Sequence, residues 1–116
     1  SQKQIGDVPV IVESVEGGNP EQLRLLLDGL RDHFKGLAVL GGTADDKVSL
    51  LVYVSPDWVS KGLHAGKLIK ELASKVGGGG GGRPDMAQAG GKDASQLPGA
   101  LASVEQLLKS QLNGQN

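Results

Sequence analysis

Six consecutive glycines at residues 77–82 interrupt the middle of the chain and restrict what it can form there. Glycine loses the most backbone freedom on folding, so a bare run of this kind usually indicates a flexible linker. Here the run lies between a strongly patterned helical segment, about residues 62–76, and a stretch of specific, non-repetitive residues. We therefore expect the backbone near it to pass close to something, either a neighbouring strand or a ligand such as a phosphate.

The residues that follow the glycines exclude two common nucleotide-binding loops. A nucleotide-hydrolysing P-loop needs Gly-Lys-Ser/Thr at its end and a helix after it, whereas Arg83 and Pro84 stand here. A dinucleotide fingerprint needs its glycines after a strand, and these glycines follow a helical pattern. Two interpretations stay open: a tight, mobile connection, or main-chain contact with the backbone of a polynucleotide.

The composition of the 116 residues indicates one domain with an aliphatic core. A chain of this length buries roughly 65% of its unfolded surface. Phe34, Tyr53 and Trp58 are the only aromatic residues, so the core has to be built from Leu, Val, Ile and Ala. The absence of cysteine excludes disulfides and thiolate chemistry, and no apolar run approaches the roughly 20 residues of a membrane span.

The start of the chain carries no recognisable signal peptide, because residues 1–6 are polar. It also lacks an initiator methionine. We expect the chain to be a mature product or a fragment of a longer protein.

Hydrophobic spacing predicts alternating strands and helices along the chain. Short, mostly β-branched runs predict strands at residues 8–15, 37–40, 47–54 and 85–89. Apolar residues at helical spacing predict helices at residues 20–35, 62–76 and 97–112, with a short helical piece around Trp58. The predicted order is therefore β-α-β-β-α-β-α.

Capping and turn residues mark the ends of several of these elements. Asn19 is expected to cap the first helix, with Pro20 in its first turn and Gly36 closing it in a left-handed conformation. Residues 41–46 are typical of a hairpin turn between the second and third strands. The cap of the last helix is expected to be Asp93 or Ser95.

These elements predict a single α/β (α+β) domain. The strand–helix–strand start favours a right-handed parallel crossover, and the hairpin adds an antiparallel pair. We expect a mixed sheet of about four strands flanked by helices over residues 1–112, followed by a disordered tail at residues 113–116.

Charge is unevenly distributed along the chain. The net charge of −1 counts against a simple electrostatic binder of nucleic acid, but residues 61–83 hold five basic side chains and one acidic one. On the predicted helix the basic side chains point away from the apolar stripe, where they suit phosphate groups. The candidate phosphate contacts are Lys61, His64, Lys67, Lys70 and Arg83. The alternative is an ordinary solvated helix face.

The other chemistry-bearing residues have mostly structural interpretations. Trp58 follows a Pro-Asp turn, and a half-exposed indole there suits stacking on a base, whereas Tyr53 lies in an apolar strand and is expected in the core. His33 and His64 are isolated, so no metal site is expected. Asp85 is expected to pair with a neighbouring cation or to cap a loop, and no catalytic residue is predicted.

Two motifs of the C-terminal half resemble a known family. Residues 80–91 read GGGRPDMAQAGG, and residues 97–104 read LPGALASV. The first motif is similar to the signature of the C-Ala domain, a DHHA1-type domain near the C-terminus of bacterial-type alanyl-tRNA synthetases. The other motif resembles the last helix of that domain. The resemblance spans about residues 77–112, and the upstream pattern is compatible with the rest of a DHHA1-like fold.

The resemblance implies a non-catalytic, tRNA-binding domain. In that family the domain docks on the elbow of tRNA(Ala), where the D and T loops meet, and so supports aminoacylation and editing of one tRNA. Glycines would allow close main-chain approach, cations would neutralise phosphates, and an aromatic ring would stack on a base. The residues then expected to bind nucleic acid are Lys61, His64, Lys67, Lys70, Gly80, Gly81, Gly82, Arg83 and Trp58.

The resemblance also implies a cytoplasmic parent enzyme that attaches alanine to tRNA(Ala) with ATP and Mg²⁺ and holds a zinc ion. No cofactor is expected in this chain, because the signatures for the ATP site and the editing zinc site do not occur in it. Its expected partners are tRNA and other domains of the synthetase, with no membrane contact. The long helical segment that dimerises the family's C-terminal region is not in the sequence, so a monomer is expected.

Two alternatives stay open beside this interpretation. DHHA1-type domains also accompany DHH phosphodiesterases, where they hold single-stranded nucleic acid or a small nucleotide. Those domains carry a Gly-Gly-His-type motif where this chain has Arg83 and Pro84, which disfavours that class. The other alternative is a purely structural module that contacts further domains of its own enzyme.

Overall fold

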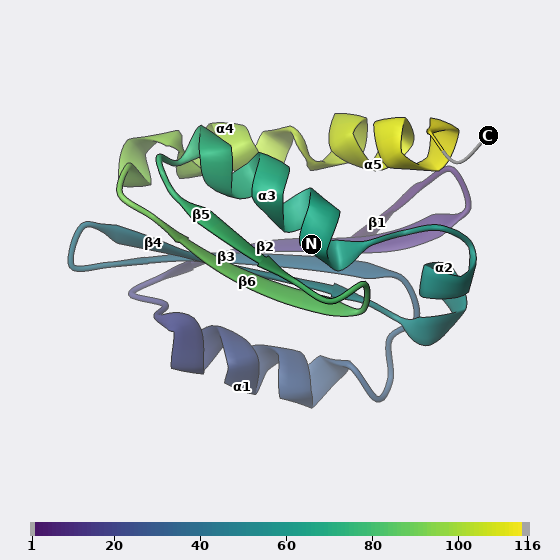
Figure 1. Ribbon diagram of the computed structural model, residues 1–116. Helices are drawn as coiled ribbons and strands as arrows, with labels where there is room; N and C mark the ends of the chain where they lie inside the picture. The colour runs from purple at the N-terminus through teal and green to yellow at the C-terminus, as the bar shows by residue number, and fades with distance from the viewer. Residues whose placement is uncertain (1, 115–116) are drawn as a thin grey trace.

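Residues 2–114 are described by the computed structural model, and they form one six-stranded sheet with helices on both faces (Figure 1). The strands are β1 (Gln2–Ile5), β2 (Val8–Glu16), β3 (Leu37–Ala44), β4 (Lys47–Val54), β5 (Gly79–Gly82) and β6 (Met86–Gly91). The helices are α1 (Pro20–Leu30), α2 (Pro56–Ser60), α3 (Ala65–Lys75), α4 (Leu97–Ala102) and α5 (Val104–Asn113), with a 3-10 turn η1 (Ala94–Gln96) before α4. In this described part of the chain, no helix is long and apolar enough to span a bilayer.

The strand order across the sheet is β1-β2-β3-β4-β6-β5. β2 and β3 run parallel and are connected through α1, whereas the other neighbouring pairs are antiparallel. The predicted mixed α/β domain is therefore confirmed, including the parallel crossover and the β3–β4 hairpin. It has six strands rather than about four, because the polar N-terminal residues and the glycine run each add an edge strand.

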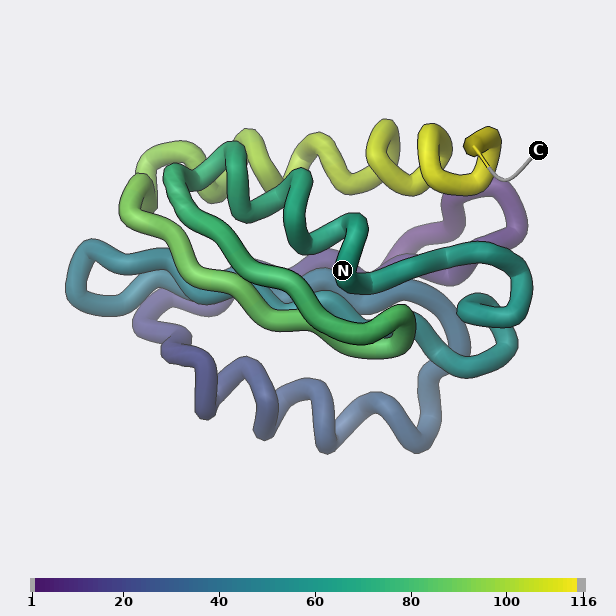
Figure 2. The backbone as a smooth tube through the Cα atoms, in the orientation of Figure 1, coloured from purple at the N-terminus to yellow at the C-terminus, as the bar shows by residue number. Residues whose placement is uncertain are grey.

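The sheet separates two apolar clusters. α1 covers one face, and α3, α4 and α5 cover the other (Figures 1 and 2). The larger cluster lies beneath α3–α5 and its buried members are all aliphatic, while the smaller cluster beneath α1 also holds Phe34 and Tyr53. β4 is buried on both faces, as its sequence predicts, because Leu50 and Val52 point into the larger cluster and Leu51 into the smaller one.

The start of α1 follows its predicted cap. The Asn19 side-chain oxygen accepts a hydrogen bond from the backbone N–H of Gln22 at 2.9 Å, and the Gln22 side chain accepts one from the Asn19 N–H at 3.0 Å. This reciprocal pair satisfies two donors that the first helical turn leaves without partners. Pro20 occupies the first turn, where no N–H is needed.

Asn19→Ala should lower the free energy of unfolding by about 1 kcal/mol, because the N–H of Gln22 loses its acceptor. Urea denaturation followed by circular dichroism measures the change. Gln22→Ala is the matched control: it removes the return bond and leaves the cap itself, so its cost should be smaller. Equal stability of wild-type and Asn19→Ala proteins would contradict this account of the cap.

The end of α1 differs from the prediction. The helix stops at Leu30 and is capped by Arg31, so the expected helical segment up to residue 35 is instead a turn. Phe34 continues the helical spacing of the apolar residues beyond Leu30, so the spacing alone predicted a longer helix. Gly36 does have a positive φ of +152°, but it lies five residues beyond the cap and serves the entry into β3 rather than the close of α1.

The turn between β3 and β4 is tighter than predicted. Residues 41–44 continue β3, and only Asp45 and Asp46 form the turn, both with positive φ (52° and 63°). Two successive residues of positive φ are typical of the two-residue hairpin turn whose twist matches the flanking strands. The glycines at 41 and 42 therefore belong to the strand, where Gly42 allows the backbone at Gly18 to approach closely.

The glycine run forms strand β5 and is not a loose connection. Gly79–Gly82 pairs antiparallel with β6, and Gly77 alone has a positive φ at the turn out of α3. Figure 2 shows this hairpin lying alongside α3. Of the two expected neighbours of the run, a strand or a ligand, the structure therefore supplies the strand.

The C-terminal helix is broken at Ser103 into α4 and α5. The Ser103 hydroxyl donates to the Ala100 carbonyl at 2.6 Å, a local bond that competes with the helical ladder. Neither predicted cap reaches α4: the Ser95 hydroxyl donates to the Asp93 carboxylate at 2.6 Å, at the start of η1. Of the predicted tail, residue 113 ends α5 and residue 114 caps it, while 115 and 116 lie outside the described residues.

Candidate nucleic-acid interface

The first turn of α3 is joined to the turn between β5 and β6. The Ala65 N–H donates to the Pro84 carbonyl at 2.8 Å, and the Gly66 N–H donates to the Arg83 carbonyl at 3.1 Å. A side chain at Gly66 would meet the Gly82 carbonyl oxygen at 2.6 Å, so glycine is needed there for this close approach. The two bonds hold Arg83 beside the start of α3.

His64 is the N-cap residue of α3. Its Nδ1 accepts a hydrogen bond from the Lys67 N–H at 3.2 Å, which identifies it as the N-cap that begins this helix. Its backbone is clamped by the Gln111 side chain of α5, which accepts from the His64 N–H at 2.9 Å and donates to the His64 carbonyl at 3.1 Å. Gln111 is a positioning residue for this region that no sequence pattern indicated.

The predicted cationic face is present on α3. Lys67 and Lys70 are exposed one helical turn apart, and the apolar side of the helix packs on the sheet through buried Leu68, Ile69 and Leu72. Arg83 has a side chain that is 68% exposed and pairs with Asp85 at 3.3 Å, as one of the interpretations of Asp85 predicted. Exposed ion pairs of this kind are weak, so the pairing leaves the guanidinium able to contact a phosphate.

Lys61 and Trp58 contact each other at the end of α2. The Lys61 ammonium lies 4.4 Å from the centroid of the Trp58 ring, in a cation–π contact. The indole is half-buried and packs against the larger apolar cluster. Stacking of a base on the ring face that carries the ammonium would require Lys61 to move away, so stacking at Trp58 stays a prediction.

The glycines of β5 divide into two sets. A β-carbon at Gly80 would collide with the Ala89 side chain, and one at Gly82 would lie 2.6 Å from the Ala87 Cα, so the pairing with β6 needs glycine at both positions. At Gly79 and Gly81 a β-carbon would meet nothing within 4 Å. The structure therefore explains two of these four glycines by packing and leaves two unexplained.

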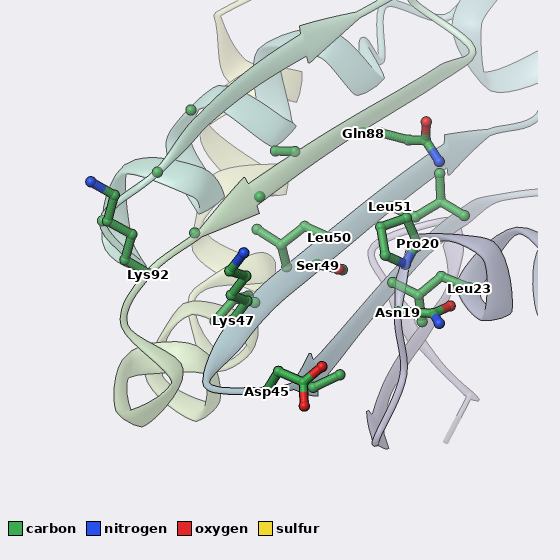
Figure 3. A pocket seen from close by; sticks show the side chains of 18 residues that line it. Asn19, Pro20, Leu23, Asp45, Lys47, Ser49, Leu50, Leu51, Gln88 and Lys92 are labelled. Carbon is green, nitrogen blue, oxygen red and sulfur yellow. The ribbon is translucent and has the colours of Figure 1, made fainter.

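A groove of about 690 Å³ lies on the opposite face of the hairpin from α3, between the starts of α1 and β4 and the end of β6 (Figure 3). It is lined by Lys47 and Ser49 of β4, Gln88 of β6 and the following Lys92, none of which was among the sequence-predicted site residues. One signal was available: Lys47 and Ser49 are the polar, alternating positions of an otherwise apolar strand.

Two perturbed groups lie away from this surface and serve the fold. The hydrogen bond from the Ser55 hydroxyl, at 2.6 Å, holds the pKa of Asp57 below its usual value. Burial raises the pKa of the Tyr53 hydroxyl, although the charge of Arg31 opposes the shift. Among residues 2–114 there is no group of three or more His, Cys, Asp or Glu side chains that could hold a metal ion.

A family model for the DHHA1 domain matches residues 7–110. This chain belongs to the DHHA1 family. It is 50% identical over 109 residues to the alanine–tRNA ligase of Geobacillus thermodenitrificans and 48% identical over 111 residues to that of Pelotomaculum thermopropionicum, covering 93% and 95% of this chain. The chain spans only 12% and 13% of the length of these two relatives.

The fold agrees with a solved member of the same family. The structure of the C-Ala domain from Aquifex aeolicus alanyl-tRNA synthetase matches with a TM-score of 0.84 and 32% sequence identity, over 93% of this chain and 97% of that one. The resemblance drawn from residues 80–91 and 97–104 is thereby confirmed: this DHHA1 chain is a C-Ala domain of the alanyl-tRNA synthetase type.

Proposed function

We propose that this C-Ala domain binds tRNA and docks on its elbow as part of an alanine–tRNA ligase, supporting aminoacylation and editing of tRNA(Ala). One observation carries the proposal beyond family membership. The backbone hydrogen bonds between the first turn of α3 and the β5–β6 turn hold Arg83 beside the start of the helix that carries exposed Lys67 and Lys70. The same turn follows a strand of bare glycines. The cations of α3 and of this turn are thereby gathered at the edge of the sheet that β5 forms, and the open glycine positions lie on the other face of the same hairpin.

The proposed mechanism is recognition of a folded RNA by its shape and charge. Lys67, Lys70 and Arg83 would each neutralise a phosphate, which positions the RNA without reading its sequence. Main chain without side chains would let riboses and bases approach the hairpin closely. Activation of alanine with ATP and Mg²⁺, and editing at a zinc site, would belong to the remaining parts of a cytoplasmic parent enzyme, with which the domain would also make contact.

Titration of this chain with tRNA(Ala) tests the proposal. With three or four phosphate contacts we expect weak, roughly micromolar binding that loses roughly 50-fold in affinity when salt is raised from about 50 to about 200 mM. Fluorescence anisotropy of labelled tRNA gives the affinities. A single-stranded oligonucleotide of the same length is the control, and it should compete poorly.

Equal competition by the single strand would contradict docking on a tRNA corner and favour the phosphodiesterase-type role. Absence of binding to either RNA would contradict an RNA-binding role altogether and favour a module that contacts only other domains.

A further inference from the structure

Three glycines on one face of the β5–β6 hairpin have no packing reason to be glycine. β-Carbons at Gly79 and Gly81 would meet nothing within 4 Å, and one at Gly90 would make only an ordinary 3.6 Å contact with the Val48 carbonyl. None of the three has a positive φ. Glycine weakens a strand, and where neither packing nor backbone conformation requires it, close approach of a ligand is one structural reason for its presence.

These glycines share one side of the sheet. Gly79 pairs with Gly90 and Gly81 pairs with Gln88, and paired residues of antiparallel strands point to the same face. On β6 that face also carries Met86, which packs against the cluster beneath α1. The bare surface therefore lies opposite α3, and it continues into the groove that Gln88, Gly79 and Gly90 line.

The groove combines a flat floor, an apolar wall and a cationic rim. Pro20 and Leu23 of α1 and Leu51 of β4 supply apolar lining (Figure 3). Gln88, Ser49 and Asn19 place polar side chains around it. Such a site suits a planar ring with hydrogen-bonding edges, because glycine main chain offers a flat surface and amide or hydroxyl groups can bind the ring edge.

Two lysines line one end of the groove. Val48 pairs with Gly91, so the next positions, Lys47 and Lys92, lie at the same end of neighbouring strands. Neither lysine forms an ion pair within residues 2–114, although the Asp45 carboxylate also lines the groove. Like charges on adjacent strands repel, and an anion between them would relieve that repulsion.

We propose that the face of the β5–β6 hairpin opposite α3 receives a nucleobase of the bound RNA, stacked on the main chain at Gly79, Gly81 and Gly90, with its phosphates at Lys47 and Lys92. This inference rests on the proposed tRNA binding and names a contact surface for it. A peptide strand is a poorer occupant for this groove, because it would pair with the free edge of β5, whereas the groove opens on the face of the sheet. On the other face of the hairpin, across the edge that β5 forms, the α3 cations then hold the phosphate backbone of the same RNA.

Gly81→Val tests the inference directly. The valine side chain would fill the stacking surface, while the open space at this position and the β-propensity of valine predict a melting temperature no lower than that of the wild type. We expect the affinity for tRNA(Ala), measured by anisotropy, to fall at least about tenfold, as loss of one stacked base predicts. Gly99→Ala, at another open glycine but on α4, is the control and should bind like the wild type.

A further variant keeps the test decisive if Gly81→Val fails to fold. Gln88→Ala removes an exposed side chain from the groove and should weaken tRNA binding without a change in melting temperature. In an NMR titration the amides of residues 47–49 and 88–91 should shift. Unchanged affinity of both folded variants, or shifts confined to α3 and residue 83, would overturn this inference and leave tRNA binding intact. Absence of wild-type binding would overturn both.

Discussion

Lys67→Glu combined with Arg83→Glu should weaken binding of tRNA(Ala) by roughly 10- to 100-fold at about 50 mM salt, because two phosphate contacts become two repulsions. The fold should survive the change. Lys67 is the third residue of α3, where glutamate favours the positive end of the helix dipole, and Arg83 loses only an exposed ion pair. Fluorescence anisotropy at several salt concentrations should also show a shallower salt dependence.

The matched control changes the same net charge at a distance from the proposed interface. Lys3 lies on β1, at the opposite edge of the sheet from β5, and Lys109 lies on α5, where it pairs with Glu105 at 3.1 Å. Lys3→Glu with Lys109→Glu should therefore reduce affinity much less. Equal losses in the two double variants would mean that only the total charge matters and would remove Lys67 and Arg83 from the binding surface.

Gly36→Ala should lower the free energy of unfolding by about 3 kcal/mol or more, the largest stability effect that we expect from a single methyl group here. Gly36 is buried with a φ of +152°, and its β-carbon would collide with the Pro9 carbonyl oxygen. The backbone at Gly36 is also held in place by two hydrogen bonds. The Gly36 N–H donates to the Ser55 hydroxyl at 2.8 Å, and the Gly36 carbonyl accepts from the Ser55 N–H at 3.0 Å.

Gly29→Ala is the control for the same chemical change in the preceding helix. Gly29 lies inside α1 with open space around its α-carbon, so alanine there should raise the free energy of unfolding by about 0.5–1 kcal/mol. Urea denaturation measures both variants. If Gly36→Ala proved as stable as the wild type, the close approach of β2 and residue 36 would be refuted.

Local sequence was sufficient where a segment's own pattern decides its structure. The first helix begins as predicted because Asn19 and Gln22 satisfy each other's backbone within four residues of chain. β4 was predicted with its observed bounds because residues 47–54 form a mostly apolar strand pattern, and six of these eight residues lie in the two apolar clusters. Both features are determined by residues that are close together in the sequence.

The glycine run shows where local sequence fails. A glycine has no side chain, so residues 79–82 carry no pattern that distinguishes a strand from a bend. Their pairing depends on β6 and on the close approach to α3 at Gly66, both of which are tertiary contacts. The polar N-terminal strand β1 was missed for the same reason, since its place at the sheet edge is defined by pairing with β2.

Only part of the candidate interface could be predicted from the sequence. Lys67 and Lys70 were predicted from helical spacing alone, and the structure does expose them together. Lys47, Gln88 and Lys92 were not predicted, because they line one groove only through the register of β4 and β6. Proximity of residues far apart in the chain is a property of strand pairing, which a single sequence does not encode locally.

The amino-acid sequence alone therefore established the family, the aliphatic core, the main helices and strands, and the cationic side of α3, since each of these is encoded by neighbouring residues. Only the tertiary structure decided that the glycines form an edge strand, that Arg83 lies against the start of α3, and that two of those glycines, Gly79 and Gly81, have open space above them. Those outcomes depend on which backbones pack together, and packing is the sum of contacts across the whole chain.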